Sequence, residues 1–118
     1  MLALLASGAT LAKTVKMPGM EHPGQVVGKH GPDSPATKAY KKALTGMIHG
    51  MEIPYTGNAD TDFVRGMIAH HQGAVDMAKV VLEYGKDREL RALAEGIVKA
   101  QETEIAFMTE WKRTHPAK

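Results

Sequence analysis

Two long helical patterns in this sequence are separated by a very short connection. Apolar residues recur at helical spacing from residue 63 to residue 82 and again from residue 90 to residue 111. Between them, Gly85 is expected to end the helix over residues 63–82 in a left-handed conformation, and Asp87 is expected to cap the helix that follows. A turn this short forces the two helices into an antiparallel hairpin.

A third helical pattern precedes the hairpin. Ser34 is a good N-cap with Pro35 in the first helical position, and helical spacing then continues to Met51. Asp60 is expected to cap the following helix. No alternating strand pattern is present, so the predicted fold class is all-α. A two-helix hairpin has too little mutual surface to be stable alone, so the N-terminal helix must pack on it. A homodimer could complete a four-helix or larger bundle.

The first 35 residues differ in composition from the helical part. Residues 2–12 are uncharged and mostly small or apolar, too short to span a bilayer, and resemble the apolar part of a signal peptide. The alternative is a short buried helix. A signal peptide would place the mature protein in the periplasm or outside the cell. Residues 13–35 are rich in Pro and Gly, which predicts a flexible arm. A helical domain over 36–114 and a tail over 115–118 follow.

Composition excludes several kinds of site. The chain has no cysteine, which rules out disulfides, thiolate metal sites and cysteine nucleophiles. Its net charge of +2 is too balanced to suggest a nucleic-acid partner. The 8 methionines outnumber the aromatic residues, and thioether sulfur can bind soft metal ions.

Four polar residues interrupt or border the apolar stripes of the expected hairpin. His71 lies in the middle of one stripe and His70 at its edge, while Gln101 and Glu104 occupy the facing stripe. A polar group buried without a partner costs about 1–3 kcal/mol, so these side chains must be partnered by each other, by a metal ion or by another subunit. A His–carboxylate pair supports a metal-bound imidazole, and it is equally a satisfied hydrogen bond of a core.

Methionines surround these histidines, and together they form the candidate metal ligands. On the helices these are Met47, Met51, Met67, His70, His71, Met77 and Met108. The arm adds Met17, Met20 and His22, which are either ligands of a soft metal or chance residues of a linker. His49 points away from Met47 and Met51 if the first helix continues to its end, and could join a site only where that helix frays.

The run from Asp60 to Ala78, with its paired histidines followed by Gln72, Gly73 and Ala74, resembles the signature of a bacterial family catalogued as domain of unknown function 305. The segments 55–60 and 100–111 are similar to two further parts of that family's pattern. The resemblance implies a ferritin-like helical bundle and export from the cytoplasm. Members of the CopM type are described as binding copper, and also silver, through Met and His. Two residues depart from the pattern: Ala69 where the family often has Pro, and Ile48 at an expected His.

Carried over by position, the resemblance implies one ligand set: Met47, His49, Met51, Met67, His70, His71, Met77 and Met108. The leading hypothesis is therefore an exported, non-enzymatic binder of copper, as Cu(I) or alternatively as Cu(II) or Ag(I), for copper homeostasis or resistance. Gln101 and Glu104 would orient an imidazole. Copper-transport or resistance proteins would be its partners.

Two other functions compete with copper binding. A structural or interaction module would use the buried His and Glu to fix helix register. A carboxylate metalloenzyme would need several inward Glu and Glu-x-x-His pairs, which this sequence lacks.

Overall fold

The computed structural model describes residues 32–116, which fold into three α-helices: α1 (Pro35–Met51), α2 (Ala59–Tyr84) and α3 (Arg88–Thr114). The prediction of an all-α fold built on a long helical hairpin with a shorter N-terminal helix is confirmed. The predicted signal peptide and most of the predicted arm, with Met17, Met20 and His22, lie outside the described residues. No helix of residues 32–116 is both long enough and apolar enough to cross a membrane.

Side-chain caps set the starts of the helices. The Ser34 hydroxyl accepts a hydrogen bond from the backbone N–H of Thr37, and the Asp87 carboxylate caps α3, as predicted. The prediction for α2 is wrong by two residues: its cap is Asn58, whose Oδ1 accepts from the Thr61 N–H at 2.9 Å. Asp60 lies instead in the first turn of α2, where a carboxylate favours the positive end of the helix dipole.

The end of α2 also differs from the expectation. Gly85 follows the helix with φ −75° and ψ 151°, an extended conformation, so the prediction of a left-handed residue is wrong. A side chain of α3 donates the hydrogen bonds that a left-handed turn would otherwise supply to the end of α2. The Arg91 guanidinium donates to the carbonyl oxygens of Leu82 and Gly85 at 2.7 and 3.0 Å. These bonds satisfy carbonyl groups that the end of a helix leaves without partners.

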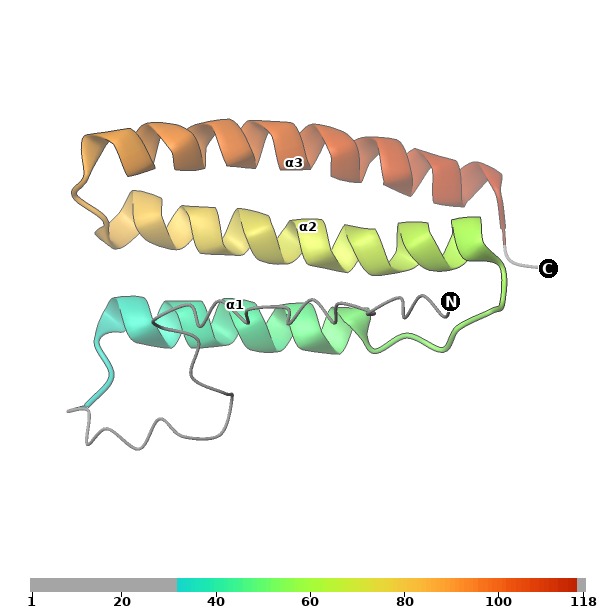
Figure 1. The fold of residues 1–118 in the computed structure, drawn as a ribbon, viewed down its shortest axis with the longest axis horizontal. Helices are drawn as coiled ribbons and strands as arrows, with labels where there is room; N and C mark the ends of the chain where they lie inside the picture. The colour runs from blue at the N-terminus through green and yellow to red at the C-terminus, as the bar shows by residue number, and fades with distance from the viewer. Residues whose placement is uncertain (1–31, 117–118) are drawn as a thin grey trace, which may run out of the picture. The chain divides into compact units, whose positions relative to one another are not determined.

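The three helices lie side by side in a row with α2 in the middle (Figure 1). Within the described residues, α1 and α3 have no pair of Cα atoms within 8 Å, so the backbone of each packs against α2. The prediction that the N-terminal helix packs on the hairpin is therefore confirmed, and its close backbone contacts are with α2. Helix α2 is covered on two opposite sides, and two further faces of the row remain open.

Small residues bring α1 and α2 close together. A Cβ placed on Gly73 would lie 2.8 Å from the Cβ, Cγ and Sδ atoms of Met47, and one placed on Gly50 would lie 2.8 Å from the Cβ of Ala69. On the other side of α2, the seam with α3 is built from buried residues of both helices. Those of α2 include Val64, His71, Val75 and Ala78, and those of α3 are Ala94 and Met108.

Candidate metal centre

A buried histidine faces a carboxylate across the α2–α3 seam. His71 is only 7% exposed, and its Nε2 lies 2.5 Å from Oε2 of Glu104. The Glu104 side chain is 59% exposed, so the carboxylate reaches solvent while the imidazole does not. An ionised carboxylate can only accept, so Nε2 carries the proton and donates. In the neutral imidazole this leaves a lone pair on Nδ1.

The second ring nitrogen of His71 has no hydrogen-bond partner among residues 32–116. Nδ1 is buried without a hydrogen bond, and so is Oε1 of Gln101, which lies about one turn before Glu104 on α3. In the neutral ring with Nε2 protonated, Nδ1 and the Gln101 oxygen are both acceptors, so these two atoms cannot bond to each other. Only a donor or a cation can satisfy them. A metal-bound imidazole commonly donates its other N–H to a carboxylate, which is the arrangement of His71 and Glu104.

Two thioethers lie at the next level of the same seam. Because α2 and α3 are antiparallel, four residues back from His71 and four residues forward from Glu104 reach the same level. These positions are Met67, which is half-buried, and Met108, which is 6% exposed. The seam thus carries an imidazole with a free lone pair and two sulfur atoms on neighbouring turns.

His70 and Met77 lie on an open face of the helix row. The His70 ring centroid is 6.1 Å from that of His71, yet the His70 side chain is exposed. Met77 is 47% exposed and lines a groove of about 300 Å³ to which all three helices contribute. Seven residues separate His70 from Met77, so both are on the same face of α2.

The candidate ligands of α1 lie elsewhere. Met47 packs against Gly73, on the side of α2 opposite the α3 seam, so the body of α2 separates it from His71. His49 is exposed, with its Nδ1 3.8 Å from a Glu52 oxygen, and Met51 is 40% exposed. Among residues 32–116, no three His, Asp or Glu side chains converge into a metal site.

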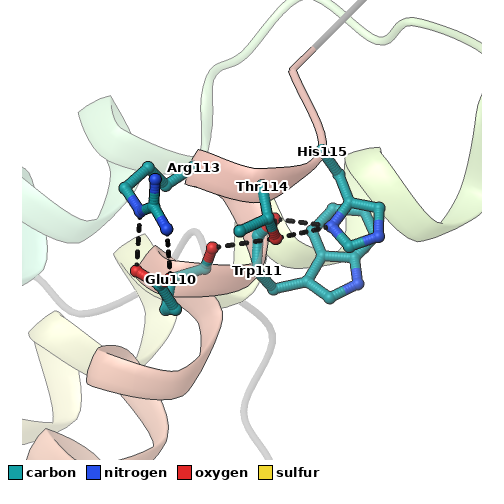
Figure 2. Close-up of polar contacts among 5 residues, drawn as sticks. All are labelled: Glu110, Trp111, Arg113, Thr114 and His115. Carbon is teal, nitrogen blue, oxygen red and sulfur yellow. Dashed lines mark hydrogen bonds and ion pairs between the residues drawn. The ribbon is translucent and has the colours of Figure 1, made fainter.

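Sequence reasoning missed the polar cluster where α3 ends. The rings of Trp111 and His115 are stacked with centroids 4.3 Å apart, and the His115 Nδ1 donates to the Trp111 carbonyl oxygen at 2.8 Å (Figure 2). Figure 2 also shows Arg113 paired with Glu110 through two contacts of 2.6 and 2.9 Å. This guanidinium lowers the pKa of the Glu110 carboxyl. The i, i+4 spacing of Trp111 and His115 was the available signal.

The loop before α2 is held by a carboxylate. Asp62 accepts hydrogen bonds from the backbone N–H and the hydroxyl of Thr56, both at 2.9 Å, and from the Gly57 N–H. The backbone bond from Thr56 is the main reason why the pKa of Asp62 lies below its usual 3.8. The loop thereby meets the end of α3 around a pocket of about 670 Å³, lined by both segments.

Comparison with known proteins identifies one family. A family model described as "Domain of unknown function (DUF305)" matches residues 8–112, which include all three helices up to the last turn of α3. No curated protein matches the chain.

Proposed function

The chain belongs to the DUF305 family, and we propose that it is a non-enzymatic, exported protein that binds copper(I) through imidazole and thioether ligands. The observation that carries the proposal is the unpartnered Nδ1 of the buried His71, whose other nitrogen is bonded to Glu104. An imidazole that a carboxylate orients through one nitrogen is suited to coordinate a metal ion through the free lone pair of the other. The DUF305 description itself names no function.

The choice of metal follows from the other donors. Met67 and Met108 supply sulfur at the next level of the seam, and soft thioether ligands favour Cu(I) over hard cations. Silver(I) shares this preference, and Cu(II), which prefers nitrogen and oxygen, is the weaker alternative. A copper-transport or resistance protein would be the donor or acceptor of the ion.

An anaerobic titration with Cu(I) against a chromophoric Cu(I) chelator tests this proposal. The wild-type chain should withdraw copper from the chelator. The variant Met67→Leu/Met108→Leu should bind at least about tenfold more weakly, because it removes the sulfur while nearly conserving volume. Met47→Leu is the matched control, since Met47 lies on the other side of α2, and its affinity should not change. Circular dichroism verifies that all variants keep their helices.

The competing function is an interaction module without metal. The His71–Glu104 bond favours this alternative as well, because it can serve as a buried hydrogen bond that fixes the register of α2 and α3. No competition for Cu(I) by the wild-type chain, or equal affinity in the double Met variant and the control, would contradict the copper proposal. A repeat with Ag(I), and with Cu(II) in the absence of reductant, identifies the preferred ion.

A further inference from the structure

One face of the helix row carries nearly all of the exposed large apolar side chains. Tyr40 of α1, Met77 of α2 and Leu93 of α3 line the same groove of about 300 Å³. Positions 3, 4, 7, 11 or 14 residues from one another share a side of a helix. By this rule Leu44 and Met51 join Tyr40, Ile48 joins Leu44, Phe63 and Tyr84 join Met77, and Leu90 and Phe107 join Leu93. We call this set the apolar face.

The apolar face is distinct from the opposite face of the row. Of the large apolar residues exposed in the described part of the chain, only Tyr55 lies outside the helices, and all of the others belong to the apolar face. The residues that line its groove include no charged side chain. The groove on the other face, between α1 and α2, is lined by charged residues among others: Lys42, Asp76, Lys79 and Glu83. The groove of the apolar face is therefore apolar and the groove of the opposite face is charged, while the exposed carboxylate of Glu104, three residues before Phe107, lies beside the apolar face.

The area of the apolar face is that of a protein interface. Its side chains expose between 36% and 72% of their surface. Large side chains of this kind offer roughly 150–250 Å² each, so the ten together expose roughly 1,000 Å². A standard interface takes about 800 Å² from each partner, and the largest apolar patch on a typical monomer is about 300–600 Å². The summed exposed area of the apolar face is therefore of the size that each partner contributes to a standard interface.

We infer that the apolar face is the interface of a homodimer, in which a second copy of this chain packs its own apolar face against the first. An interface free of charge at its centre is typical of homodimers, and a layer of helices can pair with itself about a two-fold axis. The apolar stretch 2–12 is too small to be the occupant: it holds four large side chains, all leucines, against the ten of the face. The exposed His70, seven residues before Met77, would lie within the dimer.

Sedimentation velocity of the metal-free, full-length chain tests this inference without reference to copper. The wild-type chain should sediment as a dimer. Leu93→Glu and Phe107→Glu should raise the dimer dissociation constant by a factor of about a hundred or more, because a two-fold interface buries each new carboxylate twice. Ala92→Glu and Ala106→Glu are the controls, because both alanines are exposed. Around the helix axis, Ala92 lies about 100° from Leu93, and Ala106 lies about 100° from Phe107. These two variants should remain dimeric.

Alkylation of a single cysteine provides a second measurement that does not depend on glutamate. Because the chain has no cysteine, Leu93→Cys and Ala92→Cys each introduce one thiol. The thiol at position 93 should become protected from maleimide as the protein concentration rises, and the thiol at position 92 should not. A monomeric wild-type chain would overturn the inference. So would a dimer that Leu93→Glu and Phe107→Glu dissociate no more than the controls do, or equal protection of the two thiols.

Discussion

Replacing Gly73 by alanine tests the packing of α1 on α2. In an open helix interior, Gly→Ala stabilises a protein by about 1 kcal/mol, because alanine has the better helix propensity. Gly66 is such a position, since nothing outside its own helix backbone lies within 4 Å of an added Cβ. At Gly73 the same Cβ would lie 2.8 Å from three atoms of Met47. The two substitutions therefore share the gain in propensity and differ only in the steric cost.

The steric cost decides the sign at Gly73. One of the three atoms is the Cβ of Met47, which cannot move without its backbone, so α1 and α2 must separate locally. Overpacking of this kind costs about 1–3 kcal/mol. After the gain in propensity, Gly73→Ala should leave the free energy of unfolding unchanged or lower it by up to about 2 kcal/mol. Gly66→Ala should raise it by about 1 kcal/mol, so the two variants should differ by about 1–3 kcal/mol.

Urea unfolding monitored by far-UV circular dichroism measures this difference at fixed protein concentration. Gly50→Ala should resemble Gly73→Ala, because its Cβ would meet the Cβ of Ala69 at 2.8 Å. Adding Met47→Ala to Gly73→Ala removes the Cγ and Sδ contacts and keeps the Cβ contact, so it should relieve only part of the steric cost, with a coupling energy of about 0.5 kcal/mol or more between the two sites. Equal stabilisation by Gly66→Ala and Gly73→Ala would refute the close approach of α1 and α2.

Three further predictions concern the loop before α2, the end of α2 and the candidate metal centre. The hydrogen bonds from Thr56 and Gly57 lower the pKa of Asp62 in the folded state. The Asp62 carboxylate therefore contributes to stability above about pH 4, and this contribution is lost as the pH falls through the lowered pKa. Asp62→Asn should therefore lower the melting temperature at neutral pH and flatten its decline below about pH 4; parallel profiles for the two proteins would contradict this. Arg91→Met should lower the free energy of unfolding by about 1–2 kcal/mol, because it removes the guanidinium bonds to Leu82 and Gly85. Arg88 is exposed, so Arg88→Met should change the free energy of unfolding by less than about 0.5 kcal/mol in the same urea assay. Glu104→Gln should weaken Cu(I) binding by about 10–100-fold in the chelator competition, because the amide orients His71 less firmly than the carboxylate does, and an unchanged affinity would separate Glu104 from the site.

Local patterns predicted the helices well, because the signals that define them lie within a few residues. Ser34 and Asp87 are caps in the structure, and the short connection after α2 does produce a hairpin. Gly85 shows the limit of such reasoning. The carbonyl of this glycine accepts a hydrogen bond from Arg91, which reaches back from the next helix, and residue preferences around position 85 carry no information about that contact.

The site could be predicted only within the hairpin. His71 and Glu104 lie on facing stripes whose register follows from the short turn, so their pairing was among the expected partnerships. The position of Met47 depends on which side of α2 the first helix covers. A stripe of small residues, including Gly73 and Ala69, decides this. In the sequence, such small residues can equally indicate close packing of two helices or room for a bound atom.

The arrangement of the helices in a row determines which helix can separate first by local opening. Within the described residues, α1 is joined to the hairpin by its seam with α2 and by the connection that leads into Asn58, and none of its Cα atoms lies within 8 Å of a Cα atom of α3. Brief local opening can therefore separate α1 from α2 before the hairpin opens, whereas lasting loss of α1 would leave a hairpin too small to be stable alone. Such an excursion would bare the far side of α2 and leave the pair of His71 and Glu104 intact.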